Sequence, residues 1–104
     1  LLMSKAKVYV DNDNLHVSSE ILRAIAHPLR MRILEFIDNN SDINVNKIYN
    51  TLKLEQSITS QHLRILRDAG LVNTTRDGKY IHYTVNYKRV AHVVSSVDTF
   101  LEQD

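Results

Sequence analysis

The sequence predicts a mainly α-helical fold with one small β-hairpin, and three observations support this prediction. The chain has 104 residues, a usual length for one domain. Only two residues are glycine and one is proline, so few breaks are available for a fold of many turns. Apolar residues recur at helical spacing along most of the chain, and a two-residue alternation replaces this spacing only over residues 71–85. We expect a flexible N-terminal arm over residues 1–14 and a single domain over residues 15–104.

Two helices separated by a proline are expected after the arm. Ser18 or Ser19 can cap a short helix that ends near His27. Pro28 interrupts it and can open a second helix, because proline is tolerated in the first turn. The second helix places Leu29, Ile33, Leu34, Phe36 and Ile37 inward. Its outward positions include Arg30, Arg32 and Glu35.

A third helix is expected over residues 44–52, which have four apolar positions at the spacing of one buried face. A fourth begins at Ser57, a suitable N-cap, and ends at Gly70, which favours the left-handed conformation of a helix end. The inward stripe of the fourth helix is Thr59, His62, Leu63, Leu66 and Ala69.

A hairpin and a last helix complete the domain. The segments Leu71–Arg76 and Tyr80–Val85 are rich in β-branched and aromatic residues, and Asp77-Gly78 between them predicts a type I′ turn. Asn86 can cap the final helix. This order of elements describes a winged helix-turn-helix fold with about five helices and a two-stranded wing.

Charge is unevenly distributed along the chain. The formal net charge is +1, yet residues 57–89 hold six Lys and Arg against two Asp, a net charge of +4. The residues before this segment balance to zero, and those after it are acidic. A basic middle segment favours an anionic partner there.

The residue content also excludes several functions. Without cysteine there is no disulfide, thiolate metal ligand or cysteine nucleophile. The apolar runs are too short to span a bilayer and no signal segment opens the chain, so we expect a cytoplasmic protein with no membrane partner. No phosphate-binding glycine loop, His-Glu-x-x-His motif or nucleophile elbow occurs, so we do not expect an enzyme.

Three segments resemble the ArsR family of bacterial regulators, also called ArsR/SmtB. Ile25–Leu34 (IAHPLRMRIL) is similar to the family segment Ala-Asp-Pro-x-Arg-Leu-x-Ile-Leu. Gln56–Val72 (QSITSQHLRILRDAGLV) resembles the family's recognition helix, and Arg76–Lys79 with the two tyrosines that follow resembles its wing. The resemblance covers residues 18–101 and implies a homodimeric transcription regulator whose first and last helices form a two-fold interface.

The fourth helix is the expected DNA-reading element. Its outward residues include Gln61 and Arg64, whose side chains suit the edges of adenine and guanine, while Ser57 and Ser60 lie nearer the phosphates. His62 has two interpretations, a structural hydrogen bond or a phosphate contact. The predicted DNA-binding residues of this helix are Ser57, Thr59, Ser60, Gln61, His62 and Arg64.

The wing adds Arg76 and Lys79, two cations that can straddle a phosphate or enter the minor groove, although a charged tip also aids solubility. Arg30 and Arg32 either touch the DNA backbone or lie on an exposed helix face. The alternative function is a winged helix that binds another protein. That alternative would not need Gln61, Arg64 and a basic wing together.

The metal sites of the family lack good ligands in this sequence. One site uses Cys-x-Cys on the third helix, where this chain has Asn44-Val45-Asn46, and neutral amides bind soft metals poorly. The other lies along the last helix, where the aligned positions hold Tyr87 and Arg89, then Phe100 and Gln103. His92 is the single histidine of that helix. We expect no metal and no other cofactor, and the sequence identifies no inducer.

The last helix carries more apolar surface than a small core can cover, which predicts pairing with a second copy of the chain, unless the whole face is used within the monomer. The predicted dimer interface is Ile21, Val90, Val93, Val94, Val97 and Leu101. The sequence thus predicts a DNA-binding transcription regulator, a repressor by its resemblance, that binds an inverted repeat with half-sites about one helical turn apart.

Overall fold

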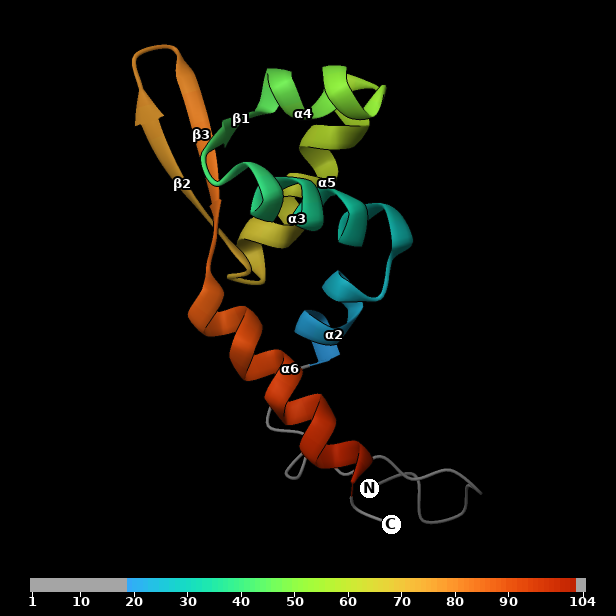
Figure 1. Cartoon of the computed structure of the whole chain (residues 1–104). Coiled ribbons are helices and arrows are strands. Elements are labelled where there is room, and N and C mark those ends of the chain that lie inside the picture. The colour runs from blue at the N-terminus through green and yellow to red at the C-terminus, as the bar shows by residue number, and fades with distance from the viewer. Residues whose placement is uncertain (1–18, 103–104) are drawn as a thin grey trace.

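The computed structural model describes residues 19–102 and contains five helices and a small antiparallel sheet within that range (Figure 1). The winged helix-turn-helix prediction is confirmed, and the arm predicted over residues 1–14 lies outside the described residues. In chain order the elements are α2 (Ser19–Ile25), α3 (Pro28–Asn40), β1 (Ile43–Asn44), α4 (Val45–Leu52), α5 (Gln56–Asp68), β2 (Val72–Asp77), β3 (Tyr80–Val85) and α6 (Tyr87–Leu101).

Side chains just outside three of the helices fix where these helices begin. The Nδ1 atom of His27 accepts a hydrogen bond from the Leu29 amide at 3.2 Å, and Pro28 occupies the first turn of α3. Asn44 and Asn86 cap α4 and α6 in the same way, each through its side-chain oxygen. The N-cap predicted for the fourth helix was wrong, because α5 starts at Gln56 and Ser57 lies within its first turn.

The C-terminal end of α5 was predicted correctly. Gly70 has a φ of +75°, the left-handed region in which a side chain would be strained. Its amide donates to the Arg67 carbonyl at 2.9 Å, and the Leu71 amide donates to the Leu66 carbonyl at 3.0 Å. These two bonds form a Schellman motif, which satisfies carbonyls that the helix leaves free and turns the chain into β2.

The sheet has the strand order β1-β3-β2, with both neighbours antiparallel. The hairpin prediction is confirmed but its turn was placed wrongly. Asp77 pairs with Tyr80, so the two-residue loop consists of Gly78 and Lys79. Gly78 has a φ of +62° and Lys79 has no positive φ, which is the pattern of a type II′ turn rather than type I′. The third strand, β1, was not predicted, and it pairs Ile43 with Tyr83 along the other edge of β3.

The core lies where α3, α4, α5 and the base of the wing meet. Each element contributes residues that are almost completely buried, and the apolar spacing of the sequence accounts for them. Completely buried aliphatic side chains are Ile33 and Ile37 of α3, Ile48 of α4, Leu63 and Leu66 of α5, and Leu71. Burial of these side chains fixes the rotation of α5 about its axis, and therefore which of its residues face solvent.

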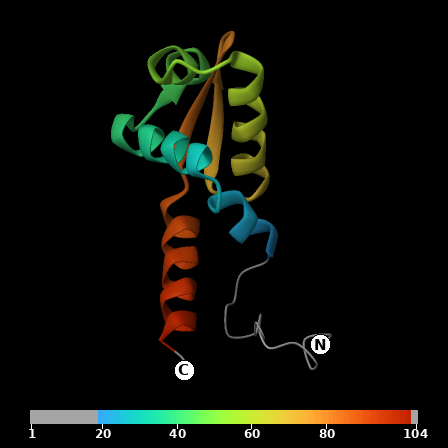
Figure 2. The same ribbon diagram turned by 90° about the vertical axis from the view of Figure 1, so that its right-hand side faces the viewer.

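The elements divide between two ends of the molecule. The tip of the wing, α4 and the start of α5 lie at one end in both views, and α6 extends toward the other end, away from the wing (Figures 1 and 2). The Asn86 amide donates to the Leu71 carbonyl at 2.9 Å, and its side-chain nitrogen donates to the Gly70 carbonyl at 2.9 Å. These bonds attach the start of α6 directly to the end of α5.

Candidate nucleic-acid interface

The outer face of α5 carries a polar stripe. Ser57, Ser60, Gln61 and Arg64 are all exposed, as predicted, because Leu63 and Leu66 on the opposite face are completely buried. The four exposed residues are spaced i, i+3, i+4 and i+7, so they form one continuous line along the helix. They present two hydroxyls, one amide and one guanidinium, which can donate to and accept from base edges and phosphates.

Thr59 does not belong to this face. The side chain is completely buried, with a relative exposure of 0%, and its hydroxyl donates to the Glu55 carbonyl at 2.8 Å. The prediction that Thr59 binds DNA was therefore wrong. Its hydroxyl instead makes a local bond in the first turn of α5, to the same carbonyl that accepts from the Thr59 amide at 3.0 Å.

Arg30 is the main residue that sequence reasoning misjudged. The prediction placed it on an outward face of α3, but only 7% of the residue is exposed. Its Nε atom donates to the Ala24 carbonyl at 2.8 Å, and its Nη2 atom donates to the Arg23 carbonyl at 3.0 Å. Arg30 thus caps the C-terminal end of α2, where a cation is favoured by the free carbonyls.

Arg30 also connects this region to α5. Its Nη1 atom lies 3.2 Å from Nδ1 of His62, and since a guanidinium only donates, the histidine nitrogen accepts. The rings of His62 and His27 lie 4.7 Å apart between centroids. Of the two interpretations of His62, these contacts support the structural one, in which the histidine holds α5 against the start of α3.

The surroundings of His62 lower its pKa from the ordinary value of 6.5, mainly through burial and further through His27 and Arg30. A lowered pKa means that the folded state resists protonation, so stability falls as the pH drops below 6.5 toward the pKa of the folded state. We expect urea unfolding to give a smaller free energy at about pH 5.5 than at about pH 7.5. A His62→Gln variant should lose this part of the pH dependence, and an unchanged dependence would contradict the assignment.

The wing presents its two predicted cations at the tip of the hairpin. Arg76 and Lys79 are both exposed, and Nε of Arg76 donates to the Gly78 carbonyl at 3.2 Å across the turn. The Lys79 ammonium lies 5.5 Å from the ring centroid of Tyr80, a cation–π distance. These contacts restrict both side chains, which lowers the entropy lost when they bind an anion.

A groove joins the wing to the recognition helix. Its volume is about 430 Å³, and it is lined by Ser60 of α5, Lys79 and Tyr80 of the wing, and the first turn of α4. The sequence could not indicate this groove, since its walls come from three separate segments. Ser60 of the exposed α5 face and Lys79 of the wing therefore lie on one continuous surface.

The residues predicted for a dimer interface differ in exposure. Val94 and Leu101 are 54% and 67% exposed, and Ile21, Val90 and Val97 are half-buried. Val93 is only 2% exposed, so its inclusion was wrong because the folded chain already covers it. Val94 and Leu101 both belong to α6, the helix that extends away from the wing (Figure 1).

The positions of the family's metal sites hold an N-cap, Asn44, and two residues at the start of α6, Tyr87 and Arg89. The Tyr87 hydroxyl donates to the Asp38 carboxylate, and this hydrogen bond raises the pKa of Tyr87. Gln103 lies outside the described residues. Over residues 19–102 no group of three or more His, Asp or Glu side chains could hold a metal ion, and no helix in that range could cross a membrane.

Comparison with known proteins identifies the relatives of this chain. Residues 27–74, from the N-cap of α3 into the wing, match the model of the bacterial regulatory protein family ArsR. The transcriptional repressor PagR of Bacillus anthracis is 33% identical over 91 residues, which cover 84% of this chain and 91% of PagR. The chain belongs to the ArsR family. The resemblance found in the sequence is thereby confirmed, as is the prediction of a transcription regulator and not an enzyme.

Solved structures of ArsR-type regulators share the fold. The crystal structure of PagR superposes with a TM-score of 0.67 at 31% identity and covers 84% of this chain and 99% of that one. NolR from Sinorhizobium fredii gives a TM-score of 0.68 at 28% identity, with 88% and 93% covered. The ArsR relatives also include a transcriptional activator, HlyU of Vibrio cholerae, 35% identical over 74 residues that cover 71% of this chain and 68% of HlyU.

Proposed function

We propose that this ArsR-family protein is a transcriptional repressor that binds an inverted-repeat operator as a homodimer. The observation that carries the proposal is the exposed line of Ser57, Ser60, Gln61 and Arg64 on α5, with a groove between Ser60 of this line and Lys79 of the wing. A helix with such a face fits the major groove, and a basic hairpin beside it can reach the neighbouring backbone. Such a protein acts where the chromosome lies, in the cytoplasm.

In this proposal Gln61 and Arg64 read bases, and Ser57, Ser60, Arg76 and Lys79 contact phosphate and sugar. His62 holds α5 in place through its contact with Arg30. We propose no metal at the two family positions, because amide, phenol and guanidinium groups replace the usual ligands there. Residues 15–104 act as one DNA-binding and dimerisation domain, with the second subunit paired along α6.

Fluorescence anisotropy with the metal-free protein tests the proposal. The protein is titrated onto DNA from upstream of its own gene and onto a scrambled duplex, at low and at physiological salt. We expect selective binding with two protomers per duplex. Equal, salt-sensitive binding to both duplexes would contradict an operator within that DNA. Absence of binding at both salt concentrations would instead favour a winged helix that contacts another protein.

Lys79→Ala is expected to weaken binding to both duplexes by a similar factor, because a phosphate contact carries no sequence information. The slope of log affinity against log salt should fall by about 0.9 in magnitude for each phosphate that the variant no longer binds. The measurement is anisotropy over a range of salt concentrations. Lys88→Ala removes the same charge from exposed α6 and serves as the matched control. A weakening confined to the operator duplex would contradict a phosphate role for Lys79.

Val94→Asp is expected to shift the protein from dimer to monomer. Val94 is 54% exposed on α6, and a charge buried there against a second subunit would lack a partner. The expected loss of dimer stability is about 2 kcal/mol or more, measured by sedimentation equilibrium. Thr99→Asp is the control, since Thr99 is an exposed polar residue of the same helix. If Val94→Asp forms dimers of unchanged stability, Val94 does not lie in the dimer interface.

A further inference from the structure

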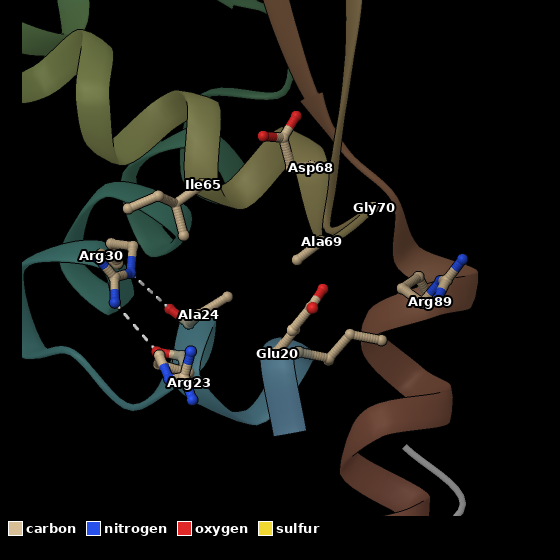
Figure 3. A pocket seen from close by; sticks show the side chains of 10 residues that line it. Glu20, Arg23, Ala24, Arg30, Ile65, Asp68, Ala69, Gly70 and Arg89 are labelled. Atoms are coloured by element: carbon tan, nitrogen blue, oxygen red, sulfur yellow. Dashed lines mark hydrogen bonds between the residues drawn. The ribbon is translucent and has the colours of Figure 1, made fainter. Parts of the chain in front are cut away.

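A cleft separates the recognition helix from the helices behind it. Its volume is about 430 Å³, and it lies between α2, the C-terminal half of α5 and the first turn of α6. Figure 3 shows Arg30 and Ile65 on one side of the cleft, Arg89 on the other, and Glu20 between them. The α5 residues that line the cleft, Ile65, Asp68 and Ala69, follow Arg64 in the chain, so the cleft lies at the C-terminal end of α5.

The most unusual group in the wall of the cleft is the Arg30 guanidinium. The residue is 93% buried, and its three hydrogen bonds all go to neutral acceptors, two carbonyls and the His62 ring. A guanidinium has five N–H donors, so two remain without an acceptor in the described part of the chain. Across residues 19–102 the one contact within 4.0 Å between a basic and an acidic side chain joins His82 to Asp42, so no described carboxylate lies within 4.0 Å of the Arg30 guanidinium. Buried charges are normally paired, which leaves Arg30 suited to an additional anionic partner.

The same cleft contains carboxylates that are also unpaired. Glu20 and Asp68 line it together with Arg23 and Arg89, and none of these four forms an ion pair with another described residue. A simple organic anion at Arg30 would lie close to Glu20, which opposes its binding. A ligand carrying both charges would complement both sets of groups. Apolar wall residues between them, among them Ile21, Ala24 and Ile65, favour an apolar body.

We propose that this cleft binds a small zwitterion with an apolar side chain, of the amino-acid type. The ligand carboxylate accepts from the free N–H groups of Arg30 and from Arg23, and its ammonium group is bound by Glu20 and Asp68. The apolar body packs against the aliphatic wall. Each charge of the ligand then has a partner of opposite sign, and the buried Arg30 gains a carboxylate that residues 19–102 do not supply.

Arg30 gives this site a direct connection to the recognition helix. The guanidinium that would receive the ligand carboxylate is 3.2 Å from His62 of α5, and α5 itself forms one wall of the cleft. A carboxylate on the free N–H groups of Arg30 draws the guanidinium toward the cleft and away from the His62 ring, so the bound state holds α5 less firmly. Resting on the proposed DNA-binding function, we infer that the ligand lowers operator affinity, since it binds better to a state in which DNA binds worse.

The site is tested first without DNA. The full-length protein labelled with ¹⁵N is titrated with L-phenylalanine, and with 3-phenylpropionate and phenethylamine, which lack the ammonium and the carboxylate respectively. We expect saturable amide shifts for L-phenylalanine over residues 20–24, 65–70 and 89. Each analogue should bind at least about tenfold more weakly, the effect of losing one charged hydrogen-bonding group. Absence of saturable shifts, or equal binding by 3-phenylpropionate, would overturn the proposal.

Paired variants locate the bound ligand. Glu20→Gln and Arg23→Gln remove one charge each from exposed side chains of the cleft, so neither disturbs the core. Both should weaken L-phenylalanine binding by about tenfold. Glu35→Gln and Arg32→Gln make the same chemical changes at exposed positions of α3 outside this cleft. Both should leave L-phenylalanine binding unchanged. If the cleft variants and the control variants bind L-phenylalanine with equal affinity, the ligand binds elsewhere on the surface and the proposed site is wrong.

The coupling is tested separately by anisotropy on the operator duplex with and without saturating L-phenylalanine. We expect the dissociation constant to rise by at least about fivefold, the lower range of allosteric couplings. An unchanged constant, with the amide shifts present, would overturn the coupling and leave the binding site intact. Failure to bind any DNA would count against the proposed function alone, because the amide shifts are measured without DNA.

Discussion

Arg30→Ala is expected to lower the free energy of unfolding by about 2 to 4 kcal/mol, a large fraction of the stability of a small domain. The substitution leaves three acceptors without their donor, namely the Arg23 and Ala24 carbonyls and the His62 ring. It also removes the long side chain that fills the space between α2 and α5. Urea unfolding at fixed pH and protein concentration measures the loss.

Arg32→Ala is the matched control for this experiment. Arg32 lies two residues further along α3 and is exposed, so its removal should change stability by no more than about 0.5 kcal/mol. A second measurement separates the loss of the Arg30–His62 contact from a general loss of packing. Without the Arg30 cation beside it, His62 should show a higher pKa by NMR titration, since Arg30 is one of the causes that lower it. If Arg30→Ala and Arg32→Ala lower the free energy of unfolding equally, Arg30 does not hold α2 and α5 together.

The case of Arg30 shows which part of the structure a sequence does not contain. The apolar period of α3 gives the rotation of that helix relative to its own core face. It does not give the angle at which α2 approaches, and the partners of Arg30 are carbonyls at the end of α2. A backbone acceptor is present at every position whatever the residue type, so no residue pattern could indicate these bonds.

Elements defined by local signals were predicted well. Pro28, Asn44, Asn86 and Gly70 each mark a helix end by side-chain or backbone chemistry that acts within a few residues. β1 has only two residues and exists because Ile43 pairs with Tyr83, about forty positions away, so it has no local signal. The observed hairpin turn lies one position after the predicted one. The pairing of Asp77 with Tyr80 determines which two residues form the loop, whereas the dipeptide Asp77-Gly78 fits either placement.

The candidate site was predicted in the same uneven way. Helical spacing placed Ser57, Ser60, Gln61 and Arg64 on one face, and all four are exposed. The same spacing placed Thr59 on the inner stripe, and its burial at 0% exposure removes it from the DNA-binding set. The groove between α5 and the wing and the cleft at the C-terminal end of α5 depend on how separate elements pack, so only the folded chain reveals them.

Arg64→Ala is expected to weaken binding to the operator by about 1 to 3 kcal/mol, while binding to a scrambled duplex falls much less. The exposed Arg64 side chain lies on the same line as Gln61, at the C-terminal end of the face that would enter the major groove. If it donates two hydrogen bonds to one guanine, its loss removes discrimination at that base pair and little of the general attraction to phosphate. Anisotropy with operator duplexes that differ at single base pairs measures this effect.

Arg64→Lys distinguishes base reading from simple charge. Lysine keeps the positive charge but lacks the planar fork of arginine, so it supports a phosphate contact and not the same bidentate contact with guanine. We expect Arg64→Lys to bind the operator as weakly as Arg64→Ala does. On the scrambled duplex its affinity should equal that of the unchanged protein. A lysine variant with normal operator affinity would instead assign Arg64 to the phosphates. Gln61 would then be the one base-reading residue left on α5, because a serine hydroxyl can donate to or accept from any base pair and discriminates weakly.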